Sequence, residues 1–215
     1  MDSLVGLPRA ARSTFPYDTT LKRLLDVVLA AIGLVATLPL WLAIVIAVRL
    51  DSPGPAVFIQ ERVGLNGRLF RFYKFRSMFT DAEHRLAELE SSNEVSGPVF
   101  KMRADPRVTR IGTLLRRTSL DELPQLLNVL KGDMSLVGPR PPLPREVEKY
   151  TPTDAVRLSV KPGLTCLWQI SGRSTVSFDE WMALDRDYVH NMSFWLDLTI
   201  LARTVRAVLS MRGAY

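Results

Sequence analysis

The chain has 215 residues, enough for one domain with a sizeable core or for a domain with a membrane anchor. Its 28 Lys and Arg outnumber its 22 Asp and Glu, and a net charge of +6 favours anionic partners such as nucleic acid, acidic lipid or phosphorylated substrates. The single Cys166 excludes an internal disulfide framework and a cysteine zinc cluster, and two distant histidines give a zinc hydrolase little support.

The first 20 residues differ sharply from the segment that follows them. Residues 1–20 hold Pro8 and Pro16, few apolar side chains and no periodicity, which predicts a flexible tail. From Val27 to Val48, 22 consecutive residues carry no charge, and at about 1.5 Å per residue they reach roughly 33 Å, the thickness of a bilayer core. We therefore predict a membrane helix over residues 21–50, followed by a domain over 51–215.

An apolar run of this kind could also be a signal peptide or a buried core helix. A signal peptide is disfavoured because the run is too long, begins too late and has no small-residue cleavage site after it. A buried core helix is disfavoured because an uncharged stretch of this length is rare in a small soluble domain.

Pro39 lies past the middle of the run and predicts a kink, since proline removes one helical hydrogen bond and clashes with the preceding turn. Basic residues flank both ends of the run, so the positive-inside rule does not select an orientation for a straight span. A re-entrant helix that bends at Pro39 and a kinked helix that spans the membrane both remain open on these grounds.

A β-hairpin is predicted next. Residues 57–63 and 69–75 are rich in β-forming side chains and are joined through Asn66-Gly67, the strongest short-range hairpin signal. Beyond the hairpin, the pattern predicts a charged helix over 81–90, a polar loop over 91–97 and a short basic helix over 109–117.

The next predicted helix runs from Ser119 to Lys131. Ser119 and Glu122 form a capping-box pattern, and Gly132 is placed to end the helix. Asp121 and Glu122 then lie in its first turn. Four leucines recur at helical spacing and predict one buried stripe: Leu123, Leu126, Leu127 and Leu130.

The remaining chain is read as an irregular stretch and two helices. Residues 137–142 are too rich in proline for helix or strand, and amphipathic helices are predicted over 178–190 and 193–212. Asp185-Arg186-Asp187 mimics the metal motif of many glycosyltransferases, but its helical setting favours a solvated helix face. The predicted fold class is α/β, rich in helix and membrane-associated, with a small hairpin and amphipathic surface helices.

Basic residues gather ahead of an acidic pair. Residues 61–80 hold five Lys or Arg and one acid, and residues 101–118 hold six with Asp105 as their single acid. Asp121-Glu122 follows at the predicted helix start. Guanidinium groups and a helix N-terminus bind phosphates, while a carboxylate can attack phosphorus or hold a metal. The pattern favours phosphoryl transfer, although two acids in a first turn can also simply complement the helix dipole.

Six segments, in chain order, carry a family resemblance that runs from about residue 21 to residue 215. The chain resembles the bacterial sugar transferases of the monotopic phosphoglycosyl transferase superfamily, which act in exopolysaccharide and O-antigen synthesis. The segments are Gln60-Glu61-Arg62-Val63-Gly64, Lys74-Phe75-Arg76-Ser77-Met78, Asp105-Pro106-Arg107-Val108-Thr109-Arg110-Ile111-Gly112, Arg116-Arg117-Thr118-Ser119-Leu120-Asp121-Glu122-Leu123-Pro124-Gln125, Gly132-Asp133-Met134-Ser135-Leu136-Val137-Gly138-Pro139-Arg140-Pro141 and Lys161-Pro162-Gly163-Leu164-Thr165.

The resemblance implies a two-step transfer. Asp121 would attack the β-phosphorus of a UDP-sugar and expel UMP, and polyprenyl (undecaprenyl) phosphate would then take the sugar 1-phosphate from Asp121. Glu122 would position Mg²⁺ or the incoming phosphate, and Asp121 and Glu122 are the expected metal ligands. Residues expected to bind substrate are Lys74, Arg76, Arg116, Pro139, Arg140, Pro141, Lys161 and Arg173.

The resemblance also sets expectations for substrate and location. The sugar would be glucose or galactose rather than an N-acetylated sugar. The enzyme would sit in the bacterial inner membrane with its catalytic domain facing the cytoplasm, and the kinked helix over 21–50 would be re-entrant, which keeps the basic residues before it on the cytoplasmic side. A homo-oligomer is compatible with these expectations. Nucleic acid is not an expected partner, because no nucleic-acid-binding motif is present. The alternative from another class is a non-catalytic membrane-tethered module that binds anionic lipid.

Two departures from the family pattern lead to further expectations. Many relatives carry Ser-Pro at the membrane bend, whereas this chain has Leu38-Pro39. Thr37 could take the part of the missing serine by bonding back to an earlier carbonyl. The short segment before residue 21 also predicts that this chain lacks the multi-helix membrane region of the larger relatives.

Overall fold

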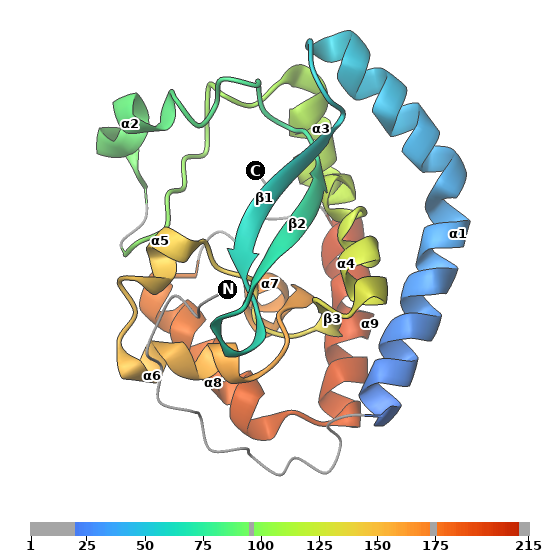
Figure 1. Ribbon diagram of the computed structural model, residues 1–215, viewed down its shortest axis with the longest axis vertical. Helices are drawn as coiled ribbons and strands as arrows, with labels where there is room; N and C mark the ends of the chain where they lie inside the picture. The colour runs from blue at the N-terminus through green and yellow to red at the C-terminus, as the bar shows by residue number, and fades with distance from the viewer. Residues whose placement is uncertain (1–19, 95–96, 173–175, 211–215) are drawn as a thin grey trace.

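The computed structural model describes residues 20–94, 97–172 and 176–210, and it is rich in helix with small β elements, as predicted (Figure 1). The helices are α1 (Thr20–Asp51), α2 (Leu86–Leu89), α3 (Arg110–Thr118), α4 (Gln125–Lys131), α5 (Pro144–Val147), α6 (Pro152–Ala155), α7 (Leu167–Ser171), α8 (Phe178–Asn191) and α9 (Phe194–Ser210), with 3₁₀ turns η1 (Leu65–Gly67), η2 (Glu90–Ser92), η3 (Leu120–Glu122) and η4 (Val156–Ser159). The strands are β1 (Val57–Val63), β2 (Leu69–Phe75), β3 (Ser135–Val137) and β4 (Gly163–Thr165).

Helix α1 is continuous and bows along one side of the molecule (Figure 1). Buried polar contacts tie its first turns to the rest of the fold. Lys22 forms an ion pair with Asp197 of α9 and donates to the carbonyl of Val137 over 3.1 Å. Asp26 accepts hydrogen bonds from the Ser135 hydroxyl and the Leu136 amide, over 3.0 and 2.9 Å.

The other end of α1 is tied to the same domain. Arg76, at the end of the hairpin, donates to the carbonyls of Ser52 and Pro53 over 2.6 and 2.7 Å. The amide of Ile111 donates to Asp51 over 3.0 Å, so α3 also contacts this end. Both ends of α1 are therefore anchored on one compact set of elements.

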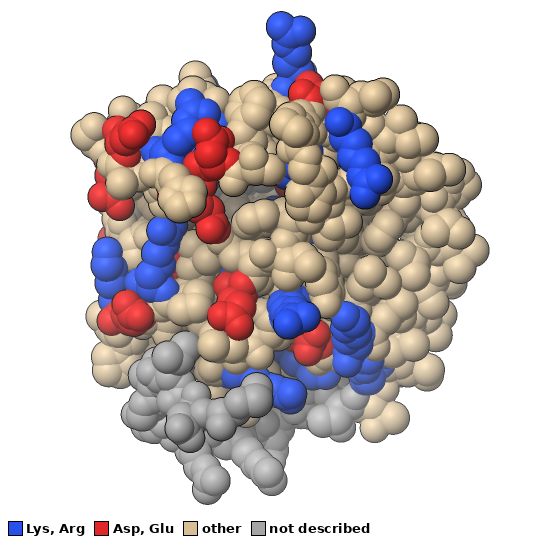
Figure 2. Space-filling model, turned by 45° about the horizontal axis from the view of Figure 1, so that its top comes forward, with Lys and Arg blue, Asp and Glu red and all other residues tan. Residues whose placement is uncertain are grey.

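The outward face of α1 is apolar and uncovered. Among the described residues, α1 is the one helix long and apolar enough to cross a membrane, and only 11% of its apolar window is buried. This exposure counts against the core-helix interpretation. Figure 2 shows a broad uncharged surface on the side where α1 lies. Exposed side chains along it include Leu24, Val28, Ile32, Val35, Leu38, Leu42 and Ile46.

The Thr37 hydroxyl bonds to an earlier carbonyl, as expected, but not to the carbonyl that Pro39 leaves without a helical partner. The Thr37 hydroxyl donates to the carbonyl of Gly33 over 2.7 Å and receives the indole N–H of Trp41 over 3.1 Å. The carbonyl that loses its helical partner to Pro39 belongs to Val35, four residues earlier. Thr37 therefore bonds backward as predicted without replacing the bond that the proline removes.

The hairpin is confirmed with its predicted bounds. Strands β1 and β2 pair antiparallel, from Val57 opposite Phe75 to Val63 opposite Leu69. The connection contains η1, where Asn66 and Gly67 adopt positive φ angles of 55° and 79°. Asparagine and glycine tolerate this left-handed region, which is why the Asn66-Gly67 signal located the turn correctly.

The predicted helix over 81–90 is largely wrong. Only Leu86–Leu89 is α-helical, and η2 follows it directly. Helix α2 has no buried residue and no side-chain cap at its N-terminus. A single helical turn that does not pack against the fold gains too little stabilising free energy to grow into a longer helix, because short helices depend on burial of one face.

The predicted helix from Ser119 to Lys131 is broken into two parts. Ser119 adopts a left-handed φ of 58° and ends α3, with no side-chain cap bond, so the predicted capping box is wrong. Pro124 is the N-cap of α4, since its ring and missing N–H cannot be accommodated inside a helix. Between these two residues lies η3, and it carries both Asp121 and Glu122.

Helix α4 ends as predicted, but its buried face extends beyond the predicted leucines and is partly polar. Gly132 has a φ of 88° and its amide donates to the carbonyls of Asn128 and Val129, which ends the helix. Of the four predicted core leucines, Leu126 is buried, and Leu123 and Leu130 pack half-buried against the core. The side chains that are buried most deeply are instead Gln125, Asn128 and Val129. Asn128 is buried because its side chain bonds the backbone of β2 at Arg71 and Tyr73.

A parallel pair of short strands is not predicted by the sequence. Strand β3 pairs with β4, with Ser135 opposite Gly163 and Val137 opposite Thr165, so Val137 belongs to a strand and not to the irregular stretch. The strands approach so closely that a Cβ on Gly163 would lie 2.1 Å from the amide nitrogen of Gly138. Helices α8 and α9 match their predicted ranges closely over the part of the chain that the structure describes.

The largest core cluster joins elements from the whole length of the chain. Ala30 of α1, Phe72 of β2, Val129 of α4 and Ile200 of α9 are all buried in it, with Met134 at the start of β3. Burial of these side chains holds α4 against both the hairpin and α1. The turn η3, at the start of α4, is positioned by the same packing.

Candidate active site

A cavity of about 1340 Å³ opens beside the hairpin and η3. Ligand pockets for small molecules are commonly of about 300–1,000 Å³, so this cavity has room for a large substrate. Its lining includes eight basic and four acidic side chains: Arg62, Lys74, Arg76, Lys101, Arg107, Arg116, Arg140 and Arg145 with Glu83, Asp121, Glu122 and Glu146. The excess of cations suits an anionic ligand.

Asp121 and Glu122 meet two cations at the wall of this cavity. Lys74, on β2, places its ammonium 2.9 Å from Glu122 and 3.4 Å from Asp121. Arg140, in the turn between Pro139 and Pro141, places Nη1 2.9 Å from the same Oε1 atom of Glu122. The 3₁₀ turn η3 carries both carboxylates, and both line the cavity.

The two carboxylates differ electrostatically. Burial raises the pKa of Asp121, and the charge of Lys74 opposes this change only in part. Burial would also raise the pKa of Glu122, but Lys74 and Arg140 outweigh it and lower that pKa to about 2. Glu122 therefore holds a fixed negative charge, and Asp121 is the more basic carboxylate of the two.

Arg116, in the last turn of α3, also lines the cavity. Its Nε donates to the Ser77 hydroxyl over 3.1 Å, and burial lowers its pKa while the charges of Asp121 and Asp105 oppose that change. No carboxylate lies within ion-pair distance of Arg116 in the part of the chain that the structure describes. Arg116 is thus a desolvated cation beside the acidic pair.

The structure brings together most of the residues singled out from the sequence. Lys74, Arg116, Arg140 and Pro141 line the cavity together with the acidic pair. Arg76 also reaches the cavity wall, but its guanidinium is bonded to the end of α1.

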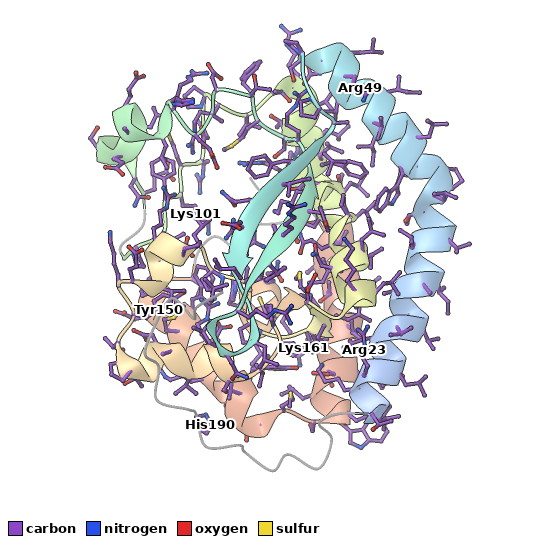
Figure 3. The ribbon with its side chains drawn as sticks, viewed as in Figure 1. Arg23, Arg49, Lys101, Tyr150, Lys161 and His190 are labelled. Atoms are coloured by element: carbon purple, nitrogen blue, oxygen red, sulfur yellow. The ribbon has the colours of Figure 1, made fainter. Side chains whose placement is uncertain are left out.

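Three other residues do not reach the acidic pair or cannot be placed. Pro139 is buried next to a smaller space, and its carbonyl accepts the Gly163 amide over 2.9 Å. Lys161 is absent from the cavity lining and lies with Arg23 beside Gly132 (Figure 3). Arg173 lies outside the described residues.

Arg62 is a cavity residue that the sequence analysis did not single out. Its Nη1 donates to the carbonyl of Pro141 over 3.0 Å, and burial together with the charge of Arg140 lowers its pKa to about 10. The hairpin register carried a usable signal, because Arg62 and Lys74 fall on the same face of the antiparallel pair. The alternation of the strands could have placed Arg62 on the face that carries Lys74.

Lys101 is a second cation that was missed. It lines the cavity, its ammonium lies 5.7 Å from the ring centre of Trp168, and burial with the charge of Arg140 lowers its pKa to about 8 (Figure 3). Lys101 lies in a segment with no regular secondary structure, so no sequence periodicity could have indicated the side it faces.

The Asp185-Arg186-Asp187 run is not wholly a solvated face. Asp185 is buried and forms an ion pair of 2.6 Å with the buried Arg157, whereas Arg186 and Asp187 lie nearer solvent. The expectation was wrong for Asp185, because the helix turns that one residue toward η4 while its neighbours face outward.

The described residues offer Mg²⁺ two carboxylates and no complete cage. No group of three or more His, Cys, Asp or Glu side chains able to hold a metal occurs among them. Mg²⁺ is typically held by one or two carboxylates, water and substrate phosphates. Asp121 and Glu122 fit that pattern only if the remaining ligands come from a bound substrate.

Comparisons with known proteins identify a family for this chain. Residues 17–211 match the family described as bacterial sugar transferase. The chain is 52% identical over 90% of its length to "Galactosyl transferase CpsE" of Streptococcus agalactiae, and 45% identical over 91% to "Undecaprenyl-phosphate galactose phosphotransferase" of Salmonella typhimurium. It is 40% identical over 97% of its length to "Exopolysaccharide production protein ExoY" of Sinorhizobium fredii.

The relatives differ in how much of their own length is matched. The chain spans 43% of the streptococcal protein and 42% of the Salmonella protein, but 94% of the Sinorhizobium protein. The match to the family covers nearly all of this chain, and it includes the acidic pair and the cations around it. The chain therefore belongs to the bacterial sugar transferase family.

Proposed function

We propose that the protein transfers a sugar 1-phosphate from a UDP-sugar to polyprenyl phosphate through a phosphosugar intermediate on Asp121. The observation that carries this proposal is the Asp121-Glu122 pair, held by Lys74 and Arg140 in a cavity rich in cations. The printed names of relatives include galactose and glucose phosphotransferases that act on undecaprenyl phosphate. Galactose or glucose is therefore the sugar we propose, in the first membrane step of polysaccharide synthesis.

In the first step, a carboxylate oxygen of Asp121 attacks the β-phosphorus of the UDP-sugar. The bond from this phosphorus to the oxygen bridging the two phosphates breaks, and UMP leaves with that oxygen. In its ionised form the carboxylate needs no base to activate it. Lys74, Arg116 and Arg140 lie where they could compensate charge on the phosphates.

In the second step, an oxygen of polyprenyl phosphate attacks the phosphorus held on Asp121. The acyl-phosphate bond breaks, the carboxylate is restored, and a diphosphate-linked sugar leaves. A mixed anhydride keeps the transfer potential of the original diphosphate, which an ester to serine would largely lose. Mg²⁺ held by Asp121 and Glu122 would neutralise phosphate charge when bound.

Release of UMP tests this proposal directly. The full chain is incubated in detergent or lipid with Mg²⁺ and polyprenyl phosphate, and UMP is measured for UDP-glucose, UDP-galactose and their N-acetylated counterparts. We expect turnover with one of the two plain hexoses. A protein that binds anionic vesicles but releases no UMP from any of these donors would support the non-catalytic lipid-binding module instead.

Arg140→Ala is expected to lower the rate of UMP release by about 100-fold, because Glu122 loses a bonded cation and the phosphates lose a charge partner. Arg117→Ala is the matched control, since Arg117 follows Arg116 in α3 but is exposed and does not line the cavity. We expect Arg117→Ala to stay within about twofold of wild type. Equal losses in the two variants would contradict a specific phosphate-binding role for Arg140.

We further propose that α1 is re-entrant, with both of its ends on the cytoplasmic side of the inner membrane. At about 1.5 Å per residue, its 32 residues reach roughly 48 Å, so a straight span would carry Lys22 and Asp26 across the bilayer. Their buried contacts with Asp197 and Ser135 would then be lost. The anchoring of both ends on one domain supports the re-entrant arrangement.

Cysteine labelling tests this topology. A single cysteine at position 14, in a Cys166→Ser background, is expected to react with an impermeant maleimide only after the membrane is broken, because UDP-sugars and the catalytic domain are cytoplasmic. Glu148→Cys, at an exposed site in that domain, is the matched control and should behave identically. Labelling of position 14 in intact spheroplasts, with Glu148→Cys protected, would mean that α1 spans the membrane.

A further inference from the structure

Arg157 is a buried arginine behind the active site. It lies in η4, 2% of it is exposed, and it forms a 2.6 Å ion pair with Asp185 of α8. Its Nη1 donates to the Tyr150 hydroxyl over 2.5 Å, and its guanidinium lies 5.3 Å from the ring centre of Trp181. Arg157 does not line the catalytic cavity, so it is not a direct ligand for a substrate.

One of its hydrogen bonds leads to the active site. Arg157 Nη2 donates to the backbone carbonyl of Arg140 over 2.7 Å, while the side chain of Arg140 bonds Glu122 on the cavity side. The backbone of Arg140 is therefore held by Arg157, while its side chain forms an ion pair with Glu122. The turn that carries Arg140 is the link between the two.

This turn needs support from outside itself. Pro139 and Pro141 have no backbone N–H, so the segment cannot form the ladder bonds that would fix a strand or a helix. Its carbonyls are instead bound by other elements: Pro139 by the Gly163 amide, Arg140 by Arg157, and Pro141 by Arg62. Of these three donors, Arg157 is the one bonded to the carbonyl of the catalytic-site arginine itself.

We propose that Arg157 is a positioning residue for the transfer reaction, which holds the Arg140 backbone so that the Arg140 guanidinium meets Glu122 and the substrate phosphates. Asp185 and Tyr150 hold the guanidinium of Arg157 in the required orientation. This role rests on the proposed function of the cavity. It also accounts for the burial of Asp185 within a run that otherwise has the composition of a surface helix.

The planar guanidinium of an arginine is suited to holding several partners at fixed positions. One rigid guanidinium meets three partners at once: Nη1 donates to the Tyr150 hydroxyl, and Nη2 donates to the Arg140 carbonyl and forms the ion pair with the Asp185 carboxylate. A lysine at this position would keep the charge and the pair with Asp185, but its single ammonium on a flexible stem cannot fix all three. Arg157→Lys therefore separates a structural role from a positioning role.

The test measures UMP release per folded molecule for wild type, Arg157→Lys, Arg140→Ala and the double variant. We expect Arg157→Lys to fold with a circular dichroism spectrum like that of wild type and to lose about 100-fold in kcat, since a displacement of about 1 Å in a catalytic group has that effect. In the Arg140→Ala background, Arg157→Lys should cause no further loss, because the group that it positions is absent.

Two results would overturn the proposal. One is a wild-type rate for folded Arg157→Lys, and the other is the same fractional loss in the presence and absence of the Arg140 side chain. Failure of the proposed function would look different, since wild type itself would then release no UMP.

Additional variants keep the test decisive if Arg157→Lys does not fold. Tyr150→Phe removes one bond to Arg157 and leaves the Asp185 pair, and we expect a loss of several-fold that again disappears in the Arg140→Ala background. A loss that persists there would overturn the proposal. Arg186→Gln is the control, because Arg186 is adjacent to Asp185 but pairs with Asp154 over 3.4 Å near the surface. It should match wild type in rate, and a loss as large as that of Tyr150→Phe would count against a specific role for Arg157.

Discussion

Asp121→Asn is expected to lower the transfer rate by about 1,000-fold or more while the protein stays folded. The amide has nearly the same shape as the carboxylate, but it cannot form the acyl-phosphate that the proposed reaction requires. Wild type incubated with the UDP-sugar alone should gain the mass of a phosphohexose, measured on the intact protein, and Asp121→Asn should not gain it.

The same substitution is not expected to destabilise the protein. Burial raises the pKa of Asp121, which means that the fold is more stable when this carboxyl carries no charge. The neutral amide should therefore leave the midpoint of thermal unfolding unchanged or raise it. Lys74 keeps Glu122 as its ion-pair partner in the variant.

Asp81→Asn provides the matched control, because Asp81 is exposed and does not line the cavity. It should keep the wild-type rate and gain the phosphohexose mass. Turnover by Asp121→Asn at near the wild-type rate would show that Asp121 is not the nucleophile, even if the donor and acceptor substrates are those proposed.

Removal of Mg²⁺ is expected to abolish UMP release, and addition of Mg²⁺ should restore it. Glu122 already engages both Lys74 and Arg140, so these cations alone leave the charge of an incoming diphosphate poorly compensated. The measurement is UMP release after treatment with a chelator and after titration of Mg²⁺ back into the same sample.

Thermal unfolding in the presence of the chelator is the control for this experiment. The described residues contain no cage of three or more metal ligands, so we expect the unfolding midpoint without substrate to be unchanged. Full activity in excess chelator would contradict a role for a divalent cation. A large fall in the unfolding midpoint would indicate a structural metal and not a catalytic one.

The sequence alone predicted those elements whose information is local. The hairpin was located to the residue because Asn66-Gly67 permits the positive φ angles of the turn and its flanks favour strands. The long apolar helix and the basic character of the segments around the acidic pair were visible for the same reason. Composition and short-range spacing determine such features, and contacts with residues far away in the sequence are not needed to predict them.

Asp121 and Glu122 were identified for a reason that was only partly correct. The pattern predicted them in the first turn of one helix capped by Ser119, whereas they lie in the 3₁₀ turn between α3 and α4. A capping motif competes with the backbone restriction of a nearby proline, and Pro124 prevailed here. Both acids line the cavity, but their geometry depends on how two helices meet.

The sequence by itself determined the membrane-like helix, the hairpin, the order of basic and acidic segments and the family. Only the tertiary structure decided which cations surround the acidic pair. It placed Arg62 and Lys101 in the cavity, put Lys161 beside Gly132, bonded Arg76 to the end of α1 and buried Asp185 against Arg157. The physical reason is that a long cationic side chain is steered by contacts with residues far away in sequence, and neither charge nor spacing along the chain specifies those contacts.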